Sequence, residues 1–291
     1  MTISGLTHDH QVLTTEGWIP ISEITREHLV CVLEDGEFFN YVHPEDIVKS
    51  KYSGDLYDIR SEKVDLTVAV DTMLYIKLDN ENYEKIPAKD AMGKKFSFKR
   101  DAKNKLTGVP PSPEDESPFH TMMYNRLRDI VETENKLPEW VWTLNKSDCF
   151  GGFDGLFYHM TYLHWVWGDF YMWRYETENR SLVDNIQRFC VHAGVIPHIT
   201  HKLHGKEFVI DIVDYEGEIQ SNYEGYNLEE TKVEEITNYG KIYDFFDFAD
   251  LLQDEIEEFM DDIGDWNVYN IIVPSGIFMV RKNDKIVWVC S

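Results

Sequence analysis

Alternating hydrophobic and polar residues fill the first hundred positions of the chain. The segment "QVLTTEGWIPI" alternates around Glu16-Gly17, which predicts a β-hairpin. The segment "DLYDIRSEKVDLTVAVDTMLYIKL" contains two further strand-like runs, rich in β-branched and aromatic residues. Short polar turns separate these runs. The pattern favours a compact, twisted β-fold over a parallel α/β sheet.

Beyond residue 106 the spacing of apolar residues becomes helical. Residues 107–118, "TGVPPSPEDESP", are rich in proline and predict an exposed linker. Helices are predicted over 119–135, from an N-cap at Ser181 to about Gly194, and over 242–262.

Strand patterns return between and after these helices. The segment "EFVIDIV" predicts a strand, and the tail "WNVYNIIVPSGIFMVRKNDKIVWVCS" is β-rich, with turns at 274–276 and 283–284. A β-module split by an insertion fits this order. We expect a first β-part over 1–106 and a linker over 107–118. An α/β insert over 119–240 follows, and then an acidic helix with the second β-part over 241–291.

The formal net charge of −25 limits the partners of this chain. Nucleic-acid binding needs Lys and Arg to neutralise phosphates, and no basic run is visible, so the overall field repels DNA. No apolar run reaches membrane-spanning length and no basic-then-apolar signal opens the chain, so we expect a soluble, intracellular monomer. No CxxC pair suggests a zinc knuckle or disulfide framework among the cysteines, Cys31, Cys149, Cys190 and Cys290.

Several segments, in order along the chain, carry a family resemblance. "THDHQVLTTEGWIPISEI", "GDLYDIRSEKVDLTVAVDTMLYI" and "VYNIIVPSGIFMVRKNDKIVWVCS" resemble the first, second and last two splicing blocks of inteins, self-splicing elements of the Hint fold, in their viral and phage form. The middle, from "LPEWVWTLNKSDCFGGFDGLF" to "RYETENRSLVDNIQRFCVHAGVIPHI", resembles their LAGLIDADG-type homing-endonuclease insert. The resemblance implies a β-rich Hint fold split by an α/β insert, with ancestral protein splicing and DNA cleavage.

The resemblance also assigns the splicing positions, and several of them carry the wrong residue. In the family a cysteine or serine nucleophile lies five residues before the histidine matched by His10, and Gly5 stands there. Thr7 belongs to the same block. The second block offers a threonine and a histidine that protonates the leaving amide nitrogen, matched by Ala69 and Thr72. Neither side chain replaces an imidazole.

The end of the chain departs from the family in the same way. The family ends on an asparagine that cyclises and cuts the chain, and Ser291 stands in its place with no residue after it. Cys290 is the nearest thiol. Because no activating histidine is adjacent, we interpret it as buried or idle.

The insert lacks its expected metal ligand. The endonuclease motif "LDGLMLGD" resembles "FDGLFYHM", in which Met160 replaces the metal-binding aspartate and Asp154 stands away from that position. No second clean motif is visible. We expect no cofactor for splicing, Mg²⁺ only if nuclease activity survives, and no strong affinity for an ancestral DNA target.

Two groups of histidines have a spacing that could suit a metal site. Strand alternation would place His8 and His10 on one face, but a third ligand is not identifiable, so we favour a retained block histidine with a polar neighbour. The three-residue spacing in "PHITHKLHGK" favours surface histidines over a zinc site, at His198, His201 and His204.

Two further patches could bind partners. An aromatic run could stack on bases, but only Arg174 is close, so core packing or a protein-binding patch is favoured for Trp165, Trp167, Phe170, Tyr171 and Trp173. The acidic helix 242–262 is interpreted as a solvated face over an apolar seam, with binding of a basic partner as the alternative.

Together, the substituted positions predict a copy that neither splices nor cleaves. Engineering would explain Gly5 and Ser291, but not Ala69, Thr72 and Met160, and Met1 just upstream suggests a free-standing reading frame. Two alternatives remain open: a free-standing homing endonuclease with rearranged acids, and a binding module using the acidic helix or the aromatic patch. Splicing ancestry requires residues 5 and 291 to meet in space.

Overall fold

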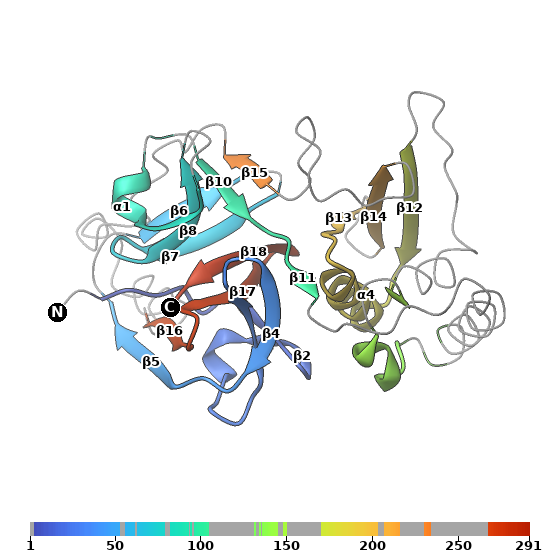
Figure 1. Ribbon diagram of the computed structural model, residues 1–291, viewed down its shortest axis with the longest axis horizontal. Coiled ribbons are helices and arrows are strands. Elements are labelled where there is room, and N and C mark those ends of the chain that lie inside the picture. Colours follow the sequence, from blue (N-terminus) through green and yellow to red (C-terminus); the bar gives the residue numbers. More distant parts are fainter. Residues whose placement is uncertain are drawn as a thin grey trace, which may run out of the picture. The chain divides into compact units, whose positions relative to one another are not determined.

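The computed structural model divides into two compact units (Figure 1). The first contains residues 1–36, 41–99 and 230–291, and the second contains 37–40 and 100–229. The structure describes residues 3–52, 56–61, 63–78, 82–92, 94, 96–104, 131, 134, 136–144, 148–149, 170–202, 207–215, 230–233 and 267–291. The predicted linker, the helix predicted over 242–262 and most of the helix predicted over 119–135 lie outside these residues.

Antiparallel strands build the larger sheet of the first unit. Its hydrogen-bonded order is β4-β3-β1-β17-β18-β8-β10-β15, with β2 paired to β1 and β9 to β8. The C-terminal hairpin β17–β18 therefore lies inside the sheet, between strands from the first hundred residues. The bounds are β1 Gln11–Thr14, β2 Gly17–Pro20, β3 Val30–Glu34, β4 Phe38–Val42, β8 Met73–Leu78, β9 Glu84–Pro87, β10 Phe96–Lys99, β15 Glu230–Val233, β17 Ile277–Lys282 and β18 Lys285–Cys290.

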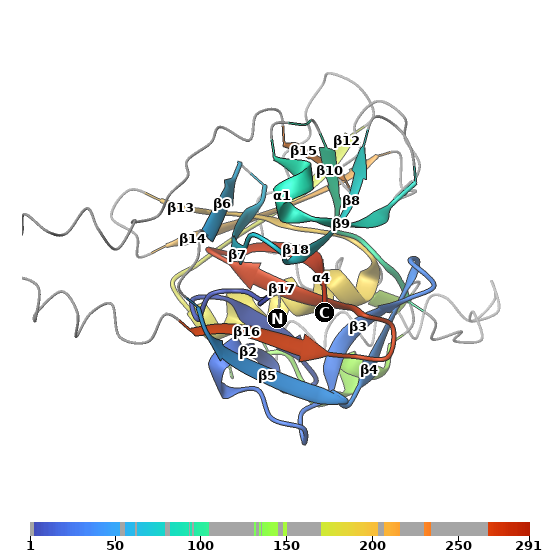
Figure 2. The same ribbon diagram turned by 90° about the vertical axis from the view of Figure 1, so that its left-hand side faces the viewer.

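The first unit also contains two sheets of two strands each. The strand β5 (Asp46–Lys51) pairs with β16 (Asn267–Ile272), and the two lie side by side in Figure 2. The strand β6 (Leu56–Arg60) pairs with β7 (Asp65–Ala69). The short helices η1 (Ile21–Glu23) and α1 (Ala88–Ala91) lie in connections.

The predicted hairpins of the first unit are confirmed. Leu13 pairs with Trp18 across β1 and β2, and the C-terminal tail forms β16, β17 and β18. The prediction of two strands over 55–78 was wrong, because the chain forms three. The Ser61 hydroxyl accepts hydrogen bonds from the amides of Lys63 and Val64, at 3.2 and 3.0 Å, which closes a tight turn between β6 and β7.

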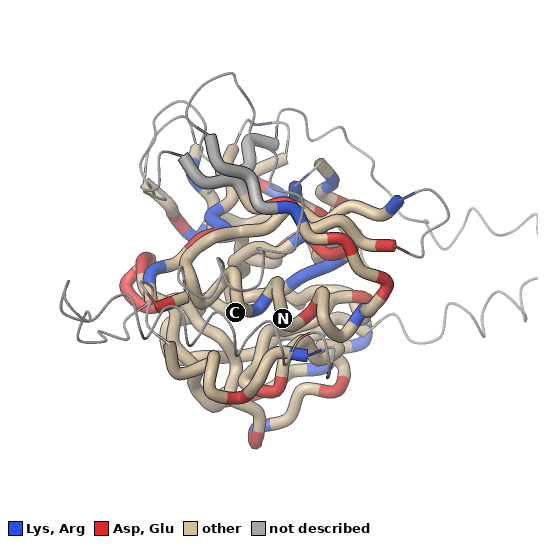
Figure 3. The backbone as a smooth tube through the Cα atoms, turned by 90° about the vertical axis from the view of Figure 1, so that its right-hand side faces the viewer, with Lys and Arg blue, Asp and Glu red and all other residues tan. Residues whose placement is uncertain are grey.

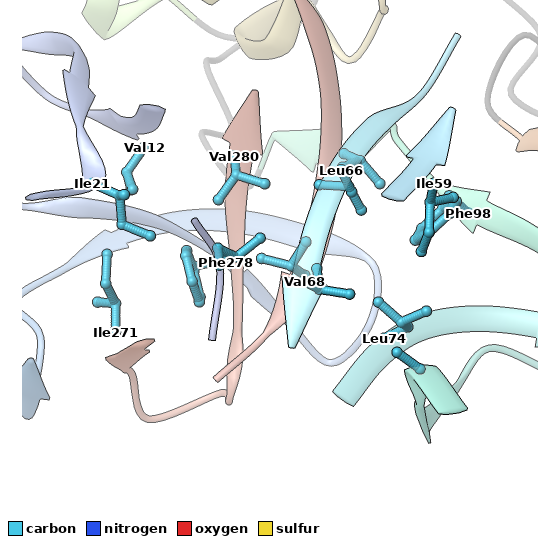
Figure 4. Packing of buried hydrophobic residues seen from close by; sticks show 14 of the residues in the cluster. Val12, Ile21, Ile59, Leu66, Val68, Leu74, Phe98, Ile271, Phe278 and Val280 are labelled. Carbon is cyan, nitrogen blue, oxygen red and sulfur yellow. The ribbon is translucent and has the colours of Figure 1, made fainter. Parts of the chain in front are cut away.

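One apolar core joins these strands. Side chains from β1, β7, β16 and β17 meet in it, as do those of β8 and β10 (Figure 4). Val12, Val68 and Phe278 have no more than trace exposure. Burial of such side chains is the main favourable term in folding.

The second unit packs a helix with a small sheet. The strands β12 (Phe170–Thr177), β14 (Phe208–Tyr215) and β13 (His198–His201) form an antiparallel sheet in that order, and β14 confirms the strand predicted from "EFVIDIV". The helix α4 (Arg180–Ala193) shares an apolar cluster with β14 and with η2 (Glu139–Thr143). A two-residue strand, β11 (Lys103–Asn104), pairs with residues 38–39.

The helix α4 corrects one predicted boundary. Its N-cap is Asn179, whose side chain accepts a hydrogen bond from the Leu182 amide at 3.1 Å, and Ser181 lies within the first turn. The predicted end is confirmed, because Gly194 adopts the left-handed conformation, with φ of 77°.

We expect Leu6→Ala to destabilise the protein by about 3 kcal/mol, because this fully buried side chain packs in the apolar core of the first unit and its loss leaves a cavity. Val48→Ala, at an exposed position of the adjacent β5, should change stability by less than about 0.5 kcal/mol. Chemical denaturation of both variants measures the difference. Equal losses would contradict this role of Leu6.

Candidate functional site

Residues 5–7 form an extended segment between two strands. On one side the Leu6 amide donates to the Tyr269 carbonyl at 2.9 Å, and the Tyr269 amide donates back at 2.8 Å. On the other side the Ala69 amide donates to the Gly5 carbonyl at 3.0 Å, and the Thr7 amide donates to the Thr67 carbonyl at 3.3 Å. The first, second and C-terminal blocks of the sequence therefore meet at Gly5.

The Thr72 hydroxyl contacts both polar backbone groups of Gly5. It accepts a hydrogen bond from the Gly5 amide nitrogen at 2.9 Å and lies 3.0 Å from the Gly5 carbonyl oxygen, to which it donates. Thr72 is buried, and its own amide donates to the Ala69 carbonyl at 2.9 Å. The position predicted to hold the leaving-group acid thus lies against the nitrogen of the Ser4–Gly5 peptide bond.

Gly5 occupies a space that no larger residue can enter without a shift. Its φ of 153° is rarely adopted by residues with a side chain, and an added Cβ would lie 2.7 Å from the Tyr269 carbonyl oxygen. That atom belongs to the backbone of a paired strand and cannot rotate away. The predicted nucleophile position is therefore closed sterically as well as lacking a reactive atom.

Ser291 is held on the same strand as residues 5 and 6. Its hydroxyl donates to the Ile271 carbonyl at 2.7 Å and accepts from the Val273 amide at 3.3 Å. Alternate carbonyls of a strand point to one edge and are about 7 Å apart, so Ile271 offers its oxygen beside that of Tyr269, the partner of Leu6. The two junction positions, Gly5 and Ser291, are neighbours along one edge of β16.

His10 is engaged by backbone groups instead of by Gly5. Its Nε2 accepts a hydrogen bond from the Thr67 amide at 3.3 Å, so Nε2 carries no proton. Nδ1 then carries the proton and donates to the Thr7 carbonyl at 3.0 Å. This buried imidazole ties the first block to β7.

The strand that a His8–His10 metal site would require is not formed. These residues lie in a turn, which the His10 amide closes by donating to the Thr7 carbonyl at 3.4 Å. As a result His8 and Asp9 are exposed while His10 is buried, and the two histidines do not share a face.

A buried lysine that the sequence pattern did not single out completes this cluster. The Lys282 ammonium lies 2.7 Å from Asp9 Oδ2 and 2.5 Å from the Thr67 hydroxyl, with Asp65 Oδ1 at 3.9 Å. Partial desolvation disfavours the Asp9 carboxylate although the side chain is 43% exposed, yet the hydrogen bond and charge of His10 and the hydrogen bond of Lys282 hold the pKa of this carboxyl well below its usual range. No local motif marks Lys282, because its partners are distant in sequence.

Cys290 is buried, as predicted. Desolvation raises the pKa of its thiol to about 12, although the Lys85 charge acts in the opposite direction. A thiol with this pKa is protonated near neutral pH and is therefore a poor nucleophile.

The remaining predicted residues belong to the second unit or lie outside the described residues. His198 and His201 lie on β13 in the other unit, where the His201 ring contacts the Phe208 ring with centroids 4.8 Å apart. Among the described residues, no group of three His, Cys, Asp or Glu side chains could hold a metal ion. Positions outside the described residues or side chains are Asp154, Met160, Trp165, Trp167, Phe170, Tyr171, Trp173, His204 and 242–262.

Charged residues of both signs occur throughout the described part of the chain (Figure 3). Lys and Arg are interspersed with Asp and Glu along the described backbone (Figure 3). Within the same residues, no helix has both the length and the apolar character needed to cross a membrane.

No protein-family model matches the sequence. The ATP-dependent Clp protease proteolytic subunit of Chlamydomonas moewusii is 39% identical over 103 residues, covering 33% of this chain and 10% of that protein. The C-terminal section of the DNA-directed RNA polymerase subunit beta of Stigeoclonium helveticum is 36% identical over 98 residues, covering 31% of this chain and 9% of that protein. The chain thus spans about a tenth of the length of these curated relatives.

A solved structure also aligns with nearly the whole chain. It is a splice-inactive variant of the AceL NrdHF class 3 split intein, with 99% of this chain and 98% of that chain covered. The sequence identity is 12% and the TM-score is 0.36, which is too low to establish a shared fold.

We expect Gly5→Ala to cost at least about 1 kcal/mol more stability than Gly17→Ala. Both glycines have positive φ, but a Cβ at Gly5 meets the Tyr269 backbone whereas a Cβ at Gly17 meets nothing within 4 Å. The comparison therefore separates the steric clash from the backbone strain. Urea unfolding of the two variants measures it, and equal losses would show that the Gly5 environment is not closed.

Cys290 should react with iodoacetamide about 1,000-fold more slowly at pH 8 than an ordinary thiol, since its pKa rises from 9.0 to about 12. Because the folded-state pKa is raised, the protonated thiol's contribution to stability is complete below pH 9 and is lost as the pH rises towards 12. Peptide mapping by mass spectrometry follows alkylation of this cysteine. The unfolded protein is the control, and rapid labelling of the folded protein would contradict the burial.

Proposed function

We propose that this chain is an intein-like element, ancestrally self-splicing, whose present copy is deficient in splicing and DNA cleavage. The observation that carries the proposal is the contact of Thr72 with the amide nitrogen of Gly5 at 2.9 Å. The position expected to protonate a leaving amide nitrogen lies against that nitrogen, although the two residues are 67 positions apart.

The arrangement of both junctions supports the same proposal. Acyl transfer from an upstream to a downstream junction requires the two to lie close together. Here Leu6 and Ser291 are bonded to the Tyr269 and Ile271 carbonyls of one strand, β16.

The side chains present explain why the reaction would stop at each step. Gly5 has no atom to attack the preceding carbonyl, so no ester or thioester forms. The Thr72 hydroxyl is far too weak an acid to replace an imidazolium as proton donor to the nitrogen. Ser291 has no side-chain amide to cyclise, and its hydroxyl is bonded to the Ile271 carbonyl.

The curated relatives fit an element that is inserted into other proteins. A Clp protease subunit and an RNA polymerase subunit are named for unrelated activities. In each case the similar segment makes up about a third of this chain but only about a tenth of the relative. This distribution supports a module that is carried by different hosts.

The ancestry of the insert stays a prediction. Asp154 and Met160, the endonuclease motif positions, lie outside the described residues. A free-standing nuclease would cut DNA in a Mg²⁺-dependent manner, and a binding module using the acidic helix or the aromatic patch would retain a stable protein partner. No described feature favours either alternative.

The proposed deficiency is tested by inserting residues 5–291 between two reporter domains, with a cysteine placed directly after Ser291. We expect mass spectrometry to find only the intact fusion, because Gly5 has no nucleophilic atom and Ser291 has no side-chain amide to cyclise. Ligated reporters would overturn the proposed loss of splicing.

The proposed ancestry is tested by restoring the chemistry in the same fusion. Gly5→Cys, Thr72→His and Ser291→Asn together should give thiol-dependent cleavage at the residue 4–5 bond, with the Tyr269 backbone shifting to admit the new Cβ at position 5. The matched control carries only Thr72→His and Ser291→Asn and has no upstream nucleophile. Circular dichroism checks that both variants fold, and an intact fusion from a folded triple variant would contradict the ancestry.

A further inference from the structure

The residue two positions before Gly5 is seated in an apolar cluster. Ile3 is partly buried and packs against the cluster formed by Leu56, Ala69 and Val268. These three residues come from β6, β7 and β16, and each has an exposed fraction of 2% or less. Tyr52 packs against the same cluster. The seat of Ile3 is therefore built from segments far apart in the sequence.

The residue immediately before Gly5 has a different environment. The Ser4 hydroxyl accepts a hydrogen bond from the Asn270 side-chain amide at 3.3 Å, between residues 266 positions apart. Asn270 is itself buried, at 8% exposure. Successive side chains of an extended segment point to opposite sides, so positions 3 and 4 meet separate surroundings.

We propose that these two environments form a subsite that selects the host segment preceding the junction. Its apolar part favours an aliphatic residue at position 3, and Asn270 favours a small hydroxyl residue at position 4. The inference deepens the proposed function, because only there do Ile3 and Ser4 stand for host residues. Docking of Ile3 holds the Ser4–Gly5 bond in place against Thr72.

The chemical reason for selection is desolvation. An aliphatic side chain gains free energy as its surface leaves water, roughly in proportion to the apolar area buried. A carboxylate at position 3 would lose part of its hydration against the apolar side chains of Leu56, Ala69 and Val268, which cannot hydrogen-bond it. The subsite therefore discriminates by charge and by aliphatic size.

The first test uses the full chain and needs no catalysis. The Leu6 amide donates to the Tyr269 carbonyl, and the Ala69 amide donates to the Gly5 carbonyl. Hydrogen exchange of these two amides therefore reports docking of the N-terminal segment. Ile3→Val should exchange within about threefold of the unaltered protein, Ile3→Ala about tenfold faster, and Ile3→Asp faster still. Val48→Ala, at an exposed position of β5, is the matched control and should change exchange by less than about twofold. Unaltered exchange in Ile3→Asp would overturn the apolar part.

The second test addresses position 4. Ser4→Ala and Asn270→Ala each remove one partner of the same hydrogen bond, so each should speed exchange of the Leu6 amide about threefold to tenfold. The double variant should be no faster than the quicker single variant, since the bond can be lost only once. Additive effects would remove Asn270 from the subsite.

A third test separates this inference from the proposed function. The restored fusion, carrying Cys at 5, His at 72 and Asn at 291, is made with Ile, Val, Ala or Asp at position 3. Cleavage that falls along this series supports the subsite. Equal cleavage in all four fusions would overturn the subsite and leave the proposed function intact. If none of the four fusions is cleaved and the exchange series is as expected, the proposed function is overturned and the subsite is still supported.

Discussion

The pairing of residues 5–7 with β16 on one side and β7 on the other is the interaction on which the first unit depends. Without this segment, β16 and β7 would each present an uncovered edge of backbone donors and acceptors inside the fold, which is costly. Leu6 bonds Tyr269 in both directions and bridges to Val68 as well. The same short segment thereby joins the N-terminal, middle and C-terminal parts of the chain, and brings Gly5 and Ser291 to one strand.

The Lys282 cluster reinforces this junction with charge. A buried ammonium is tolerated only when its partners compensate the lost hydration, and here Asp9 and Thr67 do so from two other segments. His10 links the same segments through the backbone of Thr7 and Thr67. These contacts join three segments that are distant in sequence, so the cluster makes their relative position specific.

Chemistry and packing at Gly5 agree with one another. The glycine lacks a nucleophilic atom, the Tyr269 carbonyl occupies the space next to it, and the Thr72 hydroxyl satisfies its amide and carbonyl groups. The three residues therefore contribute to the stability of the central segment. A change at Gly5 alone disturbs the packing against Tyr269, so the test of the proposed ancestry changes several positions together.

The sequence by itself determined the local elements: the hairpin at 11–20, the β-rich C-terminal tail, the strand 208–215 and the end of α4 at Gly194. The alternation or helical spacing of apolar residues and the presence of turn residues involve only a few neighbouring positions, so they can be recognised in the sequence alone. The family resemblance added the expectation that Gly5, Thr72 and Ser291 belong together. Only the tertiary structure decided that His10 bonds backbone groups, that Lys282 pairs with Asp9, and that Ile3 has an apolar seat. These contacts join residues tens to hundreds of positions apart, and the energy of such contacts comes from burial and pairing that no local pattern records.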